Sequence, residues 1–118
     1  MGSGPYREKR EHRRIEVHAL VRLESELGRG QYWSKNLSAG GVFLLAEEPL
    51  PEETRVSLEL YLPGLQTAVS AEGEVVWQQR QDPAGFAVRF LDISQAARDL
   101  IRLVITRIGG SGRRQGEG

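Results

Sequence analysis

Two arginines near the N-terminus have the side chains best suited to holding an anion. Arg10 and Arg14 have three residues between them, and both lie in the basic run KREHRR at residues 9–14. An arginine binds phosphate through a planar fork of donors, stacks on bases, and pairs with the O6 and N7 acceptors of guanine. The pair therefore indicates a site for a phosphate or a nucleotide. The alternative is a charged arm whose arginines only keep it soluble.

A second cluster, Asn-Leu-Ser-Ala-Gly-Gly at residues 36–41, combines small polar side chains with two glycines. Asn36 and Ser38 are two positions apart, so within a strand they point to the same face. Gly40 and Gly41 lack side chains and allow another molecule to approach the backbone closely. These features suit a hydrogen-bonding cradle for a ligand. Turns use the same residue types, so a purely structural turn is the alternative interpretation.

Composition limits the classes of function. With 118 residues and a formal net charge of zero, the chain suits one domain and lacks the basic surplus of a general nucleic-acid binder. It has no cysteine, and neither His12 nor His18 has a partner spaced as a metal ligand. The sequence contains no nucleophile–base arrangement and no apolar run of about 20 residues. We therefore expect a cytoplasmic, non-enzymatic protein without metal, cofactor, membrane or nucleic-acid partner.

Between Ile15 and Phe90, apolar residues alternate with polar ones, as in strands with one buried face. This pattern predicts six strands, at residues 15–23, 31–37, 42–45, 56–62, 67–78 and 86–90. Residues 24–30 are expected to form a hairpin connection. Gly73 predicts a bulge or bend in the fifth strand, and the alternation places Trp77 on the same face as Val75.

After Asp92 the apolar period changes to that of a helix. Ser94 is a suitable N-cap, and Gly109-Gly110 is expected to end the helix. The apolar stripe between them consists of Ala97, Leu100, Ile101, Val104 and Ile108.

Six short strands and one helix predict a mainly all-β fold, a six-stranded antiparallel barrel with a C-terminal α-helix, because closure removes exposed sheet edges. Residues 7–108 are expected to form this single domain, including the basic arm. Residues 1–6 are predicted to be disordered or an expression remnant, and residues 109–118 a disordered glycine-rich tail.

The two clusters, in this order and with this strand pattern, resemble the PilZ domain family. The motif R-x-x-x-R at Arg10 and Arg14 stands directly before the first expected strand, and N-x-S-x-x-G follows at Asn36, Ser38 and Gly41. The resemblance extends over most of the chain. It implies a PilZ-type barrel of bacterial origin that binds the second messenger cyclic di-GMP.

The resemblance also implies roles for individual residues. Arg10 and Arg14 would bind the ligand phosphates and guanines, Asn36 and Ser38 would hydrogen-bond a guanine, and Gly41 would leave room for it. Auxiliary contributions are expected from Lys9, Arg13, Gly40, Trp77 and Arg80. For Trp77 the alternative is packing in the core, and for Arg80 a solvated loop position. Asparagine at position 36 fits the family pattern but removes the negative charge that aspartate would bring.

By the same resemblance, the chain would be a signalling receptor acting in motility or exopolysaccharide regulation. Cyclic di-GMP would order the N-terminal arm and create a surface for an unidentified downstream protein, with the receptor a monomer or a ligand-induced dimer. Lys9, directly before the first motif arginine, favours binding of a stacked ligand pair. Two other functions remain open, a ligand-independent adaptor and a small nucleic-acid-binding barrel that uses the basic arm.

Overall fold

The computed structural model describes residues 13–110. Expectations for residues 1–12 and 111–118, which include Lys9, Arg10 and the predicted disorder there, lie outside the described residues. The strands are β1 (Ile15–Glu16), β2 (Leu20–Ser25), β3 (Gly28–Ser38), β4 (Gly41–Leu45), β5 (Arg55–Tyr61), β6 (Val69–Gln79) and β7 (Gly85–Asp92). Helix α1 spans Gln95–Ile105 and continues into a π-helical turn, Thr106–Gly110.

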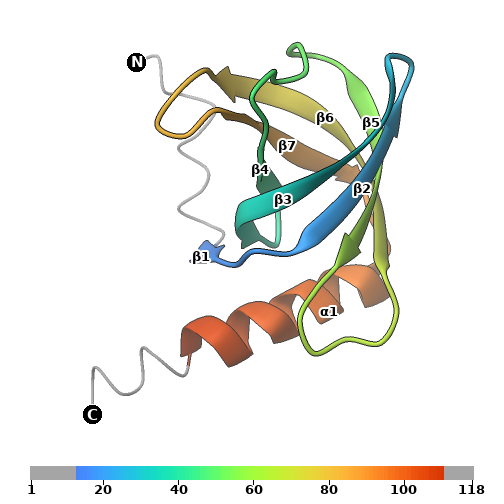
Figure 1. Ribbon diagram of the computed structural model, residues 1–118. Coiled ribbons are helices and arrows are strands. Elements are labelled where there is room, and N and C mark those ends of the chain that lie inside the picture. Colours follow the sequence, from blue (N-terminus) through green and yellow to red (C-terminus); the bar gives the residue numbers. More distant parts are fainter. Residues whose placement is uncertain (1–12, 111–118) are drawn as a thin grey trace, which may run out of the picture.

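The strands form a closed antiparallel barrel, shown in Figure 1. Strands β3, β2, β5, β6, β7 and β4 are neighbours in this order, and β4 pairs back with β3 to complete the circle. The short strand β1 pairs with β3 next to β2, so β1 and β2 form one interrupted strand. The predicted six-stranded barrel with a C-terminal helix is confirmed.

The core lies inside the barrel and follows the predicted alternation. Ile15, Val17, Ala19, Val21 and Leu23 are all buried, as is the inward face of β7 formed by Phe86, Val88 and Phe90. Burial of one face of every strand supplies the main driving force for folding.

The predicted continuous strand 15–23 is wrong in extent, because the chain leaves the strand at Val17 and rejoins it at Leu20. The buried hydroxyl of Ser34 accepts a hydrogen bond from the Ala19 amide at 2.8 Å and donates one to the Val17 carbonyl. A side chain thus replaces part of the ladder, so the backbone groups at the interruption keep partners.

The predicted hairpin connection 24–30 is too long. Strand β2 continues to Ser25 and β3 begins at Gly28, so only Glu26 and Leu27 form the turn. Gly28 has φ of 126°, a conformation that favours glycine. The register shifts between Glu72 and Gly73, where a bulge or bend was predicted, but the extra residue is Leu91 of the partner strand β7.

Helix α1 crosses one end of the barrel (Figure 1). Its predicted N-cap is confirmed, since the Ser94 hydroxyl accepts a hydrogen bond from the Ala97 amide at 3.0 Å. The buried side of the helix packs on the barrel core and consists of Ala97, Ile101, Val104 and Ile105. Ile108 was expected in this stripe but is exposed. Ile108 lies in the π-helical turn, where the residue period differs, and Ile105 is the last buried residue of α1.

Candidate functional site

The second motif forms a tight turn between β3 and β4. The Ser38 hydroxyl accepts a hydrogen bond from the Gly40 amide at 3.1 Å and lies 3.5 Å from the Gly41 carbonyl oxygen, which can accept its proton. Ser38 is buried, and its hydroxyl is engaged within the turn. The backbone of this cluster therefore forms a turn, as the structural interpretation predicted. The ligand-binding interpretation requires the same turn and stays a prediction.

Two neighbouring elements hold this turn from outside. The Phe90 amide of β7 donates a hydrogen bond to the Gly40 carbonyl at 2.9 Å. The guanidinium of Arg98, in α1, donates to the Ala39 carbonyl, also at 2.9 Å. Because the partners come from a strand and a helix remote in sequence, the position of the turn depends on the assembled fold. Sequence reasoning missed Arg98, since a helical arginine gives no local signal of such a contact.

Gly41 is required by the fold itself. A Cβ atom at this position would lie under 3.0 Å from the backbone oxygen of Val88, on the neighbouring strand β7. The missing side chain lets β4 and β7 approach each other. The expected role of Gly41, leaving room for a guanine, stays a prediction.

A bulge in β3 sets the direction of Asn36. The register between β3 and β4 shifts between Ser34 and Asn36, so Lys35 is the extra residue of the bulge. Ser34 and Leu37 are buried, whereas Asn36 is half-buried on the outer face of the barrel. Asn36 is thus directed outward at the end of β3 that leads into the motif turn.

The start of the chain's described part lies beside this turn. In the β1–β3 pairing, Ile15 is opposite Leu37 and Glu16 is opposite Asn36. Arg14 directly precedes Ile15, so its backbone lies at the same end of β3 as Ser38. Arg14 is exposed. The first motif's second arginine and the second motif are therefore neighbours in space.

The side chain of Arg13 lies against the C-terminal turn of the helix. A Cβ atom on Gly109 would lie 2.8 Å from Nη2 of Arg13, so the guanidinium packs on the Gly109 backbone. A cation is favourable at a helix C-terminus because the helix dipole is negative there. Arg13 thus contacts the end of the helix.

Trp77 shares an outer wall of the barrel with Asn36. A row of paired residues crosses four strands, from Asn36 to Phe43, Ala87 and Trp77. The rings of Phe43 and Trp77 have centroids 5.7 Å apart, and Trp77 is 37% exposed. The expectation that Trp77 shares a face with Val75 is wrong, because a register shift between them turns the indole toward the outer face, whereas Val75 is buried.

Arg80 lies apart from the motif turn. It follows the end of β6, where Gln79 pairs with Gly85, whereas Gly41 pairs with Arg89 toward the other end of β7.

Arg89 is a cation that sequence reasoning missed. Its guanidinium is exposed and lies 3.8 Å from the Glu74 carboxylate. Arg89 lies opposite Gly41 in the pairing of β4 with β7, and no local sequence pattern indicates this.

The charges around Asn36 have both signs. Glu16, opposite Asn36, lies 3.3 Å from the Lys35 ammonium and 3.8 Å from the His18 imidazole, measured to the same carboxylate oxygen. A carboxylate here would repel an anionic ligand, and Lys35 offsets that repulsion.

No group of residues suited to hold a metal occurs between residues 13 and 110. No helix in that range is long and apolar enough to cross a membrane.

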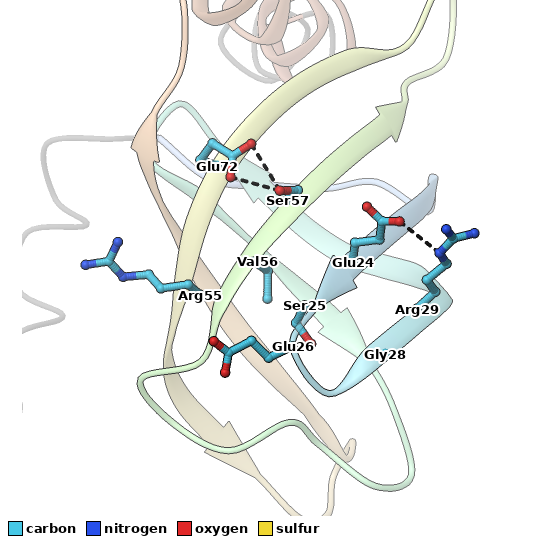
Figure 2. A pocket seen from close by; sticks show the side chains of 9 residues that line it. All are labelled: Glu24, Ser25, Glu26, Gly28, Arg29, Arg55, Val56, Ser57 and Glu72. Atoms are coloured by element: carbon cyan, nitrogen blue, oxygen red, sulfur yellow. Dashed lines mark hydrogen bonds and ion pairs between the residues drawn. The ribbon is translucent and has the colours of Figure 1, made fainter.

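A hollow of about 530 Å³ lies elsewhere, between the β2–β3 hairpin and strands β5 and β6 (Figure 2). Its lining carries both signs of charge, and Figure 2 shows Arg29 paired with Glu24 at 2.8 Å. Glu72 is hydrogen-bonded by the Ser57 hydroxyl at 2.9 Å. No motif residue lines this hollow. The candidate site, on the outer surface around the turn, is therefore separate from this hollow.

A sequence model of the PilZ domain family matches residues 8–106. The chain belongs to the PilZ domain family, and the predicted family is confirmed. The matched range includes the positions of both motifs. A search of curated protein sequences found no match.

Several solved structures share the fold. Escherichia coli YcgR in complex with c-di-GMP aligns with a TM-score of 0.75 and 18% identity, covering 92% of this chain and 50% of that one. The Bacillus subtilis inhibitor of motility MotI/DgrA gives 0.69 and 17%, covering 85% and 51%. The PilZ domain of Escherichia coli YcgR with c-di-GMP gives 0.69 and 16%, covering 92% and 98%. The chain spans about half the length of the first two proteins.

Proposed function

We propose that this chain is a receptor for cyclic di-GMP, which binds between the N-terminal arm and the turn at residues 36–41. The single observation that carries the proposal is the pairing of β1 with β3, which puts Arg14 at the same end of β3 as Ser38. The two motifs had to be neighbours for one ligand to contact both. A structure with Arg14 on the opposite side of the barrel would have refuted the idea.

The roles of the residues follow from their chemistry. Arg10 and Arg14 bind the two phosphates and the guanines, since a guanidinium pairs with both. Asn36 presents its amide on the outer wall, and the Ser38 turn presents backbone groups beside it. Trp77, partly exposed on the same wall, offers a ring on which a base can stack.

Family membership and the solved structures support the choice of ligand. Two of the three structures described above, both of Escherichia coli YcgR, contain c-di-GMP. Binding fixes the arm against the barrel and thereby creates a new surface, which a downstream protein recognises. The likeness to an inhibitor of motility favours motility as the regulated process.

Isothermal titration calorimetry with cyclic di-GMP tests the proposal. We expect saturable binding, with a stoichiometry of one ligand or, as Lys9 favours, a stacked pair. Arg14→Ala should weaken binding by about 2 kcal/mol, roughly thirtyfold, because one charge-assisted contact is lost.

Arg29→Ala is the matched control, since Arg29 is an exposed arginine at the far end of β3, where it pairs with Glu24. This variant should bind as tightly as the parent. Equal losses in both variants would mean that general charge, and not the motif, attracts the ligand. A parent chain that shows no saturable binding would refute the receptor and leave the ligand-independent adaptor in its place.

A further inference from the structure

The outer face of β4, β3, β2 and β5 carries an apolar row in strand register. Leu45 pairs with Trp33, Trp33 with Leu20, and Leu20 with Tyr61. We call these four residues the Trp33 row. Residues directly opposite each other in antiparallel strands point to the same face, so the four side chains lie side by side. The strands that carry them are adjacent in Figure 1.

The Trp33 row faces away from the core. Ser34, Val21 and Leu60, each next in sequence to a member of the row, are fully buried, so the row members point outward. Trp33 is 56% exposed and Tyr61 is 39% exposed. Exposed aromatic residues gathered in this way are typical of protein interaction sites, where tryptophan and tyrosine contribute most of the binding free energy.

The charges flanking the row are compensated within the chain. On one flank, the Lys35 ammonium lies 3.3 Å from the Glu16 carboxylate. On the other, Arg22 donates to the Tyr61 hydroxyl at 3.4 Å, and that hydroxyl donates to Glu59 at 3.0 Å. Nucleic acids and anionic lipid surfaces require unpaired cations. The occupant of this face is therefore a protein surface without strong net charge.

The closed barrel further restricts how another chain can bind. Strands β2 to β7 each pair on both sides, and the open edge of β1 is only two residues long, too short for a partner to add a strand. Association must take place face to face through side chains. Because the charges on both flanks already have partners within the chain, two copies can meet here about a two-fold axis without opposing unpaired like charges. The formal net charge of zero adds no repulsion between copies.

We propose that the Trp33 row is a dimerisation surface occupied by a second copy of this chain. The row spans three inter-strand distances of about 4.8 Å, which is small beside a stable interface of about 800 Å² per partner. The dimer is accordingly weak and forms in the upper micromolar range. The inference does not depend on cyclic di-GMP, because none of the four residues belongs to either motif.

Sedimentation equilibrium of the full chain without nucleotide tests this surface. Over about 10 µM to 1 mM, the range expected for so small an interface, we expect a monomer–dimer equilibrium. Trp33→Thr should weaken the dimer at least about tenfold, since the symmetric interface loses two tryptophans. Leu27→Thr is the matched control, because Leu27 is 63% exposed at the tip of the β2–β3 hairpin and outside the row. It should leave the equilibrium unchanged.

Fluorescence gives an independent reading that needs no substitution in the row. In a Trp77→Phe chain, Trp33 is the single tryptophan, because the sequence has two. Its quenching by acrylamide should fall as the chain concentration rises. A monomer at all concentrations, a dimer unaffected by Trp33→Thr, or a dimer with unchanged quenching would each overturn the proposal. A monomer that uses Trp33 to bind a different protein would likewise overturn it.

Discussion

Replacing Gly41 by alanine separates the two roles that a motif glycine can have. If Gly41 only leaves room for a ligand, the variant should be as stable as the parent without ligand and bind more weakly. The structure supports a different expectation, because a Cβ atom here would lie under 3.0 Å from the backbone oxygen of Val88. Unlike a flexible side chain, a backbone oxygen held in a strand ladder cannot move aside without disturbing that ladder.

The size of the effect follows from this overlap. Strands β4 and β7 must separate by about 1 Å before the new methyl group reaches ordinary van der Waals contact. Overpacking of this kind costs about 1 to 3 kcal/mol, and a backbone obstacle places Gly41→Ala near the upper value. A domain of this size has about 5 to 15 kcal/mol of stability, so the variant should still fold.

Urea unfolding of the ligand-free chain, followed by tryptophan fluorescence, measures the difference. Gly30→Ala is the control, since the three atoms nearest to a Cβ atom there all belong to the side chain of Tyr32 and none to the backbone. The tip of that side chain can shift, so the control should lose less than about 1 kcal/mol. A Gly41→Ala chain within about 0.5 kcal/mol of the parent would refute the reasoning, and the glycine would then be available for a purely ligand-related role.

Three further substitutions test other contacts. Ser34→Ala should lower the unfolding free energy by about 3 kcal/mol, measured in urea, because two buried backbone groups lose their partner; a loss below about 1 kcal/mol would contradict this. Arg98→Ala should weaken cyclic di-GMP binding about tenfold in calorimetry, because the Ala39 carbonyl loses the bond that positions the turn; unchanged affinity would show that the turn keeps its position without Arg98. Trp77→Ala should also weaken binding about tenfold if a base stacks on the indole, whereas a change in stability alone would assign Trp77 to packing.

The sequence predicts the architecture well because buried and exposed residues alternate regularly along most of the strands. Alternation along each strand separates the inward from the outward side chains, and Ser94 marks the start of the helix. The order of the two arginines and the Asn-Ser-Gly motif identified the family. Local chemistry is sufficient for these features.

The features that position the candidate site depend on contacts between distant segments. The bulge at Lys35 and the pairing of Glu16 with Asn36 are set by strand register, which no local pattern specifies. Ser34 resembles any polar strand residue until the strand interruption that it bridges is known. The outward turn of Trp77 likewise depends on a register shift against β7. Such relations appear only when the barrel closes.

The two hydrogen bonds that reach the motif turn from β7 and α1 have a consequence for signalling speed. If the chain is the receptor proposed above, the barrel and the helix position this turn before any nucleotide arrives, so binding does not have to wait for the barrel to rearrange. In the proposed receptor, sensitivity to the messenger can then be adjusted through the residues ahead of Ile15 while the turn keeps its position. Members of one family can in this way respond at different messenger concentrations while keeping the same barrel.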